Sequence, residues 1–192
     1  MDSGNIGFVL LCAAFVFVMT PGLAMFYGGL VRKKNVVNTM MTSIFIIGIG
    51  IVMWVLFGYS LSFAPSGNAF IGDFRWLGLE GVSLTEGYTD DASIPNMVFS
   101  AFQMMFAVIT PALITGAVAG RMKFKSIFVF TIFWSLIVYY PLAHMVWGQG
   151  GLLGADGIGA LDFAGGDVVH ISSGVSALVL CILLGKRHDY EH

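Results

Sequence analysis

Long apolar runs separated by short polar segments occupy most of this chain. Five of the runs reach the roughly 20 residues that an α-helix needs to cross a bilayer. They lie at about residues 5–31, 37–63, 95–120, 126–147 and 167–185. The pattern therefore predicts an all-α, polytopic membrane protein in which residues 1–192 form a single membrane domain.

The composition indicates the same class of protein. Apolar residues make up 57% of the chain and charged residues 10%, against roughly 45–50% and about 25% in soluble domains. A formal net charge of -2 leaves no basic excess to neutralise phosphates, which argues against nucleic acid as a partner. Cys12 and Cys181 lie in different apolar runs near opposite membrane faces, so we do not expect a disulfide.

Charge sets the expected orientation, because basic residues collect on the cytoplasmic side of membrane proteins. Eight of the nine Lys and Arg follow the first, third and fifth runs: Arg32, Lys33, Lys34, Arg121, Lys123, Lys125, Lys186 and Arg187. Acidic residues occupy the connections at the other end: Asp73, Glu80, Glu86, Asp90, Asp91 and Asp156. We therefore expect the N-terminus outside, the C-terminus inside, and a multi-pass location in the cell (inner) membrane.

The two outer connections differ in character. Residues 64–94 form a long acidic loop, whereas residues 148–166 are rich in glycine and contain no Lys or Arg. The second connection has two interpretations. It forms the wall of a cavity at membrane depth, where irregular backbone survives only if protein or water satisfies its polar groups, or it is a flexible surface loop.

An ionisable residue and several aromatic residues lie at membrane depth. His170 lies sixteen positions before Lys186, which at 1.5 Å per residue places it roughly 24 Å above the inner boundary and inside the bundle. Phe106 has a similar depth, Phe102 lies one turn above it, and Trp147 ends the fourth run near the outer interface. An indole attracts small cations, a phenylalanine layer excludes water, and a histidine relays protons. The order favours controlled passage of a small, weakly polar molecule, although helix packing and interfacial anchoring explain each aromatic residue alone.

Acidic residues flank the start of the fifth run. Asp162 precedes Gly165 and Gly166, and we expect it to cap backbone amides, with electrostatic attraction of a cation as the alternative. Asp167 suits a first helical turn, and His144 is expected to be a satisfied packing residue. The sequence contains no paired metal-ligand spacing, nucleophile elbow or phosphate loop, so we expect no enzyme activity, metal or cofactor.

Four strings in this sequence resemble the ammonium transporter family, which comprises the Amt, Mep and Rhesus proteins. They are MTPG (19–22), FYGGLVR (26–32), PLAHMVWG (141–148) and DFAGGDVVH (162–170). The resemblance extends from the first run to the last residue. It implies that the five runs correspond to one of two inverted five-helix repeats, the N-terminal half of a transporter.

The resemblance implies a role for each residue of the outer constellation. Trp147 would help to form an outer ammonium recruitment site, and Asp162 would support recruitment and deprotonation. Phe106 would be one ring of an aromatic gate, with Phe102 beside it. The order predicted from depth alone, with Trp147 outermost and Phe102 and Phe106 below it, agrees with these roles.

The resemblance also implies a pore below the gate. His170 would be the first of a pair of pore histidines, and Leu113 and Val146 would line the dry lumen. In such proteins ammonium is thought to lose its proton near the gate, after which ammonia crosses the apolar lumen and the proton follows the histidines.

Family members are about twice this length, with two repeats and a final helix, so the second repeat is absent from this sequence. Because the substrate path lies between inverted copies, we expect a truncated or split transporter that is not transport-competent alone. The main alternative is a non-transporting ammonium-binding, assembly or sensor module. A channel for neutral gases or water is a weaker one.

The expected partners follow from the same comparison. They are ammonium or ammonia, the lipid bilayer, further copies in a parallel homotrimer and, for a split transporter, a separate C-terminal half. An antiparallel pair would violate the positive-inside bias. Docking of P-II signal proteins is not expected, because the C-terminal region that would receive them has no counterpart in this sequence.

Overall fold

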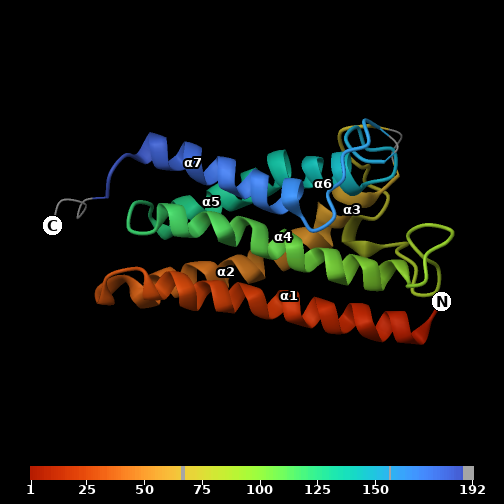
Figure 1. Cartoon of the computed structure of the whole chain (residues 1–192), viewed down its shortest axis with the longest axis horizontal. Coiled ribbons are helices and arrows are strands. Elements are labelled where there is room, and N and C mark those ends of the chain that lie inside the picture. Colours follow the sequence, from red (N-terminus) through yellow and green to blue (C-terminus); the bar gives the residue numbers. More distant parts are fainter. Residues whose placement is uncertain (66–67, 156, 188–192) are drawn as a thin grey trace.

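All regular structure in the described part of the chain is helical, which confirms the predicted all-α class. The computed structural model describes residues 1–65, 68–155 and 157–187 (Figure 1), so Asp156 lies outside the described residues. Five helical spans in these residues are long and apolar enough to cross a membrane: Ser3–Gly29, Lys33–Phe63, Asn96–Val118, Phe124–Trp147 and Gly166–Leu184. Each overlaps one of the five predicted runs.

Three of the five spans change helix type along their length. The elements are α1 (Ser3–Gly29), η1 (Lys33–Asn35), α2 (Val36–Met53), η2 (Trp54–Gly58), α3 (Tyr59–Phe63), η3 (Leu77–Leu79), α4 (Asn96–Val118), α5 (Phe124–Trp134), η4 (Ser135–Tyr139), α6 (Tyr140–Trp147), η5 (Gly166–Ile171) and α7 (Ser172–Leu184). The η2, η4 and η5 segments are π-helical turns. Such turns occur mostly as single-turn interruptions of α-helices and are frequent at functional sites.

Local sequence explains where several helices begin and end. The carboxylate of Asp2 accepts the Asn5 N–H at 2.8 Å and so caps the first turn of α1. The chain leaves α7 at Gly185, whose φ of +69° is readily adopted only by glycine. Pro21 and Pro111 lie inside α1 and α4, as proline can in membrane helices, where neighbouring groups satisfy the freed backbone.

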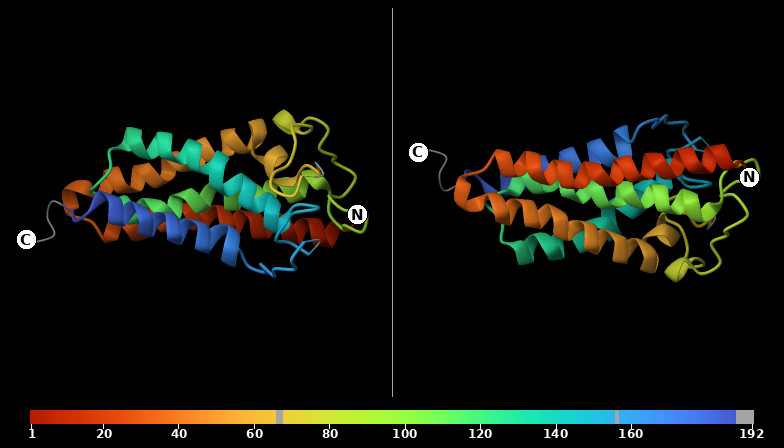
Figure 2. Two further views of the ribbon diagram at one scale, coloured as in Figure 1. Left: turned by 90° about the horizontal axis from the view of Figure 1, so that it is seen from above. Right: turned by 90° about the horizontal axis from the view of Figure 1, so that it is seen from below.

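The α4 helix lies at the centre of the bundle and contacts α1, α2, α5 and α7. The α3 helix packs on α6, and Figure 2 shows the spans lying side by side along one direction. The two ends differ. The basic end comprises residues 30–35, 119–125 and 185–187, and the loop end comprises the N-terminus and the described residues of 64–95 and 148–165 (Figure 1). The expected orientation follows from applying the positive-inside rule to these ends.

Aromatic side chains near the loop end form the main core. Trp54, Tyr59, Phe63 and Tyr140 are almost completely buried and contact one another with ring centroids 5.6–6.1 Å apart. The indole Nε1–H of Trp54 donates to the carbonyl of Ser100 at 3.2 Å, so this large ring also ties the second span to α4. Buried indole and phenol groups need such partners.

His144 is a buried packing residue, as expected. It is fully buried, and its ring nitrogens lie 3.1 Å from the Ser62 carbonyl and 2.8 Å from the Asn68 carbonyl. These contacts hold α6 against the end of α3 and the start of the first outer loop. The two free cysteines lie on α1 and α7 and form no disulfide, which agrees with the expectation from the sequence.

Candidate functional site

Three aromatic residues that the sequence singled out lie in contact. The rings of Phe102 and Phe106 on α4 are 5.0 Å apart and nearly perpendicular. The ring of Phe106 lies 6.4 Å from that of Trp147, at the end of α6, with an interplanar angle of 66°. Edge-to-face contacts of this kind are the favoured geometry for aromatic pairs. We call Phe102, Phe106 and Trp147 the aromatic stack; all three are half-buried.

The glycine-rich connection folds back on α6 and is held there by backbone hydrogen bonds. The Leu153 and Gly154 amides donate to the Met145 carbonyl at 2.8 and 2.9 Å, and the Leu152 amide donates to Ala69 at 2.9 Å. A Cβ atom at Gly151 would lie only 2.3 Å from the His144 carbonyl oxygen, so glycine is required there. These hydrogen bonds contradict the interpretation as a flexible loop, and the interpretation as a cavity wall stays a prediction.

Asp162 joins this segment to the start of the fifth span. One carboxylate oxygen accepts the Gly166 N–H at 2.7 Å, and the other accepts the Asp167 and Val168 N–H groups at 2.9 and 3.0 Å. Its own carbonyl lies 3.4 Å from the indole nitrogen of Trp147. The capping role expected from the sequence is therefore the geometry observed, and it also brings Asp162 next to the aromatic stack.

His170 lies on η5, which contacts α4, but its side chain is exposed. The prediction that this histidine is buried in the bundle is therefore wrong for this chain. The physical reason is that no described element packs over that face of η5, whereas Val168 and Val169 point into the core and are buried. The π-helical turn thus presents His170 on an open face of the bundle.

The two residues expected to line a pore occupy different environments. Leu113 is half-buried on α4, and its carbonyl accepts the Tyr27 hydroxyl at 2.9 Å. Val146 is only 6% exposed and belongs to the main core. The structure therefore does not bring Val146 to the open face that carries His170.

Gln103 is a buried polar residue, next to Phe102 in sequence, that the sequence analysis did not consider. It lies on α4 between Phe102 and Phe106, and its side-chain Oε1 is buried without a hydrogen-bond partner among the described residues. An unpaired buried acceptor is costly, so this oxygen is available to a water or to another small hydrogen-bond donor. The signal in the sequence was a polar residue in the middle of a span.

The described residues contain no cluster of three or more His, Cys, Asp or Glu side chains that could hold a metal ion.

The fold defines a multi-pass membrane protein. It has five apolar spans, a buried aromatic core and an ordered connection beside the aromatic stack. Residues 7–192 match the profile of the Ammonium Transporter Family. The chain belongs to this family.

Individual relatives agree with the family match. An ammonium transporter from Bacillus subtilis is 54% identical over 98% of this chain and 46% of its own length. The crystal structure of Mep2 from Candida albicans matches with a TM-score of 0.86 and 34% identity, over 98% of this chain and 41% of that one. A structure described as a sensor Amt protein matches with a TM-score of 0.81 and 28% identity, over 96% and 45%. The chain spans about half the length of the curated relatives it matches.

Proposed function

We propose that this chain recruits ammonium from the outer side of the membrane and supplies one wall of an ammonium conduction path. The observation that carries the proposal is the edge-on contact between Phe106 and Trp147, with the carbonyl of Asp162 at the indole nitrogen. Ring faces attract small cations. The loop end, where these residues lie, is the outer side in the expected orientation.

The neighbouring groups support a sequence of steps along this wall. The carbonyl and carboxylate of Asp162 favour a cation beside the aromatic stack, and the unpaired Oε1 of Gln103 offers an acceptor for an N–H. Below the stack, we propose that ammonia continues alone while His170 accepts the proton, since an imidazole ring can relay protons. The exposed position of His170 leaves its ring free to face a second wall.

A second wall is needed because His170 lies on an open face, where a polar ring would otherwise contact lipid at a cost in free energy. We propose that this wall is a second half of the transporter, carried by a longer chain or by a separate one. In the same proposal the assembly is a parallel homotrimer in the cell (inner) membrane.

Ammonium recruitment can be tested by tryptophan fluorescence of the detergent-purified chain. We expect ammonium chloride, but not sodium chloride, to change the emission saturably, and Trp147→Phe to abolish the change because Trp147 is the reporter. Phe106→Leu keeps the reporter and removes a ring, so the half-saturating ammonium concentration should rise about fivefold. Trp134→Phe is the matched control, since Trp134 bonds Ser176 away from the stack. An unchanged half-saturation in Phe106→Leu would contradict the proposed site.

Conduction can be tested by ammonium-evoked current in proteoliposomes. We expect no saturable current from the 192-residue chain alone, because only one wall of the path is present. Co-reconstitution with the C-terminal half of the Bacillus subtilis relative should restore a current, and His170→Ala should abolish it. A saturable, His170-dependent current from the chain alone would contradict the need for a second wall.

The sensor or assembly module is the second candidate function. It is favoured by the structural match to a protein described as a sensor Amt protein. The two functions predict different results in the same pair of assays. Saturable ammonium binding without flux, even with the second half supplied, would select the sensor or assembly module.

A further inference from the structure

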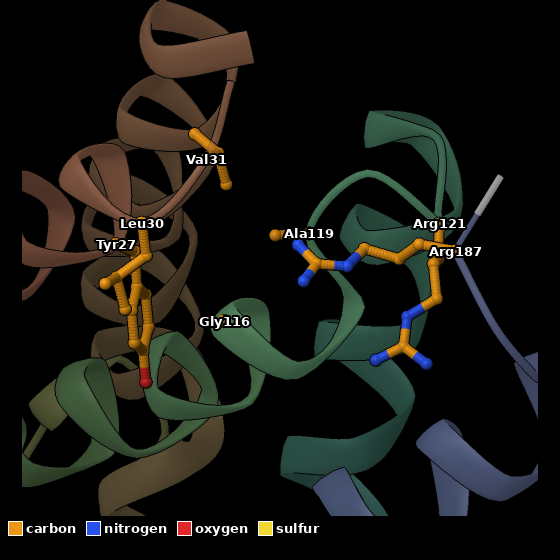
Figure 3. Close-up of a pocket in the computed structure, with 7 residues that line it drawn as sticks. All are labelled: Tyr27, Leu30, Val31, Gly116, Ala119, Arg121 and Arg187. Atoms are coloured by element: carbon orange, nitrogen blue, oxygen red, sulfur yellow. The ribbon is translucent and has the colours of Figure 1, made fainter. Parts of the chain in front are cut away.

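A pocket of about 200 Å³ opens at the basic end of the bundle, far from the aromatic stack (Figure 3). It lies between α1, α4 and the segment that follows α7. Two kinds of residue line it: Tyr27, Leu30, Val31, Gly116 and Ala119, which carry no charge, and Arg121 and Arg187. Figure 3 shows the two arginine side chains together on one side and the residues from 27–31 on the other. The pocket therefore has a cationic side and a mainly apolar side.

Arg121 is held in place by the ends of two helices. Its terminal nitrogens donate to the carbonyl of Gly185 at 2.7 Å, to the carbonyl of Ala117 and to Sγ of Cys181 at 3.1 Å. Its Nε–H is buried and has no hydrogen-bond partner among the described residues. The bonds from its terminal nitrogens fix the guanidinium beside the pocket, where its positive charge favours an anion.

Arg187 is less constrained and extends over the same pocket. Its Cδ lies 3.8 Å from the position that a Cβ would occupy at Gly120, so its stem crosses the end of the α4–α5 turn. Within the described residues neither Arg121 nor Arg187 forms an ion pair with a carboxylate. All Asp and Glu residues of the described chain lie toward the loop end. Two guanidinium groups thus share one pocket without a described counter-charge.

The opposite wall matches the apolar part of a lipid. Leu30 is 64% exposed, and the neighbouring α1 residues Phe26 and Met25 are 61% and 65% exposed, so an apolar surface leads from the pocket along the helix. The pocket lies where spans end among basic residues, which is the depth of phospholipid headgroups on the cytoplasmic side. Basic pockets between membrane helices on this side bind anionic headgroups.

We propose that this pocket binds the phosphate group of an anionic ligand, with the guanidinium groups of Arg187 and Arg121, which both line the pocket, as donors. Arginine suits this role because its planar fork matches phosphate oxygens. A phospholipid headgroup and a free phosphate share this chemistry, and the continuous apolar surface of α1 favours the headgroup. The proposal is independent of ammonium recruitment, since the pocket and the aromatic stack lie at different ends of the molecule.

The test is native mass spectrometry of the detergent-solubilised chain titrated with phosphatidylglycerol or with phosphatidylcholine. A basic side chain near an anionic headgroup changes affinity by about fivefold. We expect the chain to prefer phosphatidylglycerol, Arg187→Gln to reduce that preference about fivefold, and Arg187→Lys to retain most of it. Arg121→Gln should also reduce it, but Arg187→Gln is the decisive variant because Arg121 supports the end of α7.

Arg75→Gln is the matched control, because Arg75 is an exposed arginine at the loop end that pairs with Asp73 at 2.7 Å. Its hydrogen bond holds the pKa of the Asp73 carboxyl below its usual range. This variant should keep the full lipid preference. Displacement of phosphatidylglycerol by millimolar inorganic phosphate would support the site and assign a free anion as its ligand; failure to displace would support the headgroup. Equal binding of both lipids, or an unchanged preference in Arg187→Gln, would overturn the proposal.

Discussion

Replacing Asp162 by alanine is expected to lower the melting temperature of the detergent-solubilised chain by about 5–10 °C. The carboxylate accepts three backbone N–H groups, from Gly166, Asp167 and Val168. Alanine leaves all three without this partner at the start of a membrane span. Loss of such a cap, with charge-assisted hydrogen bonds, costs about 2–3 kcal/mol. Thermal unfolding followed by light scattering or circular dichroism measures the shift.

Two further variants separate the stability that comes from the capping hydrogen bonds from the stability that comes from negative charge. Asp162→Asn keeps one acceptor oxygen, so it should lose about half as much stability as Asp162→Ala. Asp167→Asn removes a neighbouring negative charge without removing the acceptor of these three amides, and it should change the melting temperature by only about 1–2 °C. Equal losses in Asp162→Ala and Asp167→Asn would show that charge near the helix start, and not the hydrogen bonds, provides the stability.

The Asp162 result also bears on function. If Asp162→Ala destabilises the chain, a loss of ammonium response in that variant reports on the shape of the site as well as on its charge. Asp162→Asn is then the informative variant for recruitment, since it retains part of the cap. A weakened ammonium response in Asp162→Asn at nearly unchanged stability would support the electrostatic role that the family resemblance implies.

Much of this architecture was predictable from the order of apolar runs and charges. The length of each run determined the five spans, and the positions of Lys186 and Arg121 set the depths of His170 and Phe106. The capping role of Asp162 followed from its place before two glycines. These features depend on residues that are close in sequence, or on a depth that can be counted from one charged boundary.

Other features depend on contacts between distant segments and could not be predicted in the same way. The burial of His170 requires an element that packs over its face of η5, and depth along a helix carries no information about that partner. The hydrogen bond from Arg121 to Gly185 joins residues 64 positions apart. The π-helical turns also escaped prediction, because a shift of one residue in a mostly apolar run hardly changes its pattern.

A glycine-to-alanine change at position 58 is expected to destabilise the chain by about 3 kcal/mol. Gly58 has ordinary helical backbone angles, with φ of -62° and ψ of -43°, so alanine introduces no backbone strain there. Its Cβ, however, would lie 2.7–2.8 Å from three ring and hydroxyl atoms of Tyr140. Tyr140 is only 1% exposed and contacts the rings of Trp54 and Phe57, so it cannot move away cheaply.

Gly48 provides the matched control in the same span. It lies on α2, and a Cβ added there would have no neighbour within 4 Å. Gly48→Ala should therefore leave the melting temperature unchanged or raise it, since alanine favours helix by up to about 1 kcal/mol. The opposite signs of the two glycine-to-alanine changes would assign the loss at position 58 to close packing between the second and fourth spans.

A double-mutant cycle tests the contact directly. Tyr140→Leu alone should destabilise the chain, because it removes a buried ring. In that background Gly58→Ala should cost at least 1 kcal/mol less than in the original chain, since residues in contact show coupling energies of about 0.5–3 kcal/mol. The added methyl group then enters the space that the ring has left. If Gly58→Ala costs the same in both backgrounds, the destabilisation does not arise from Tyr140, and the close approach of these two spans does not require glycine at this position.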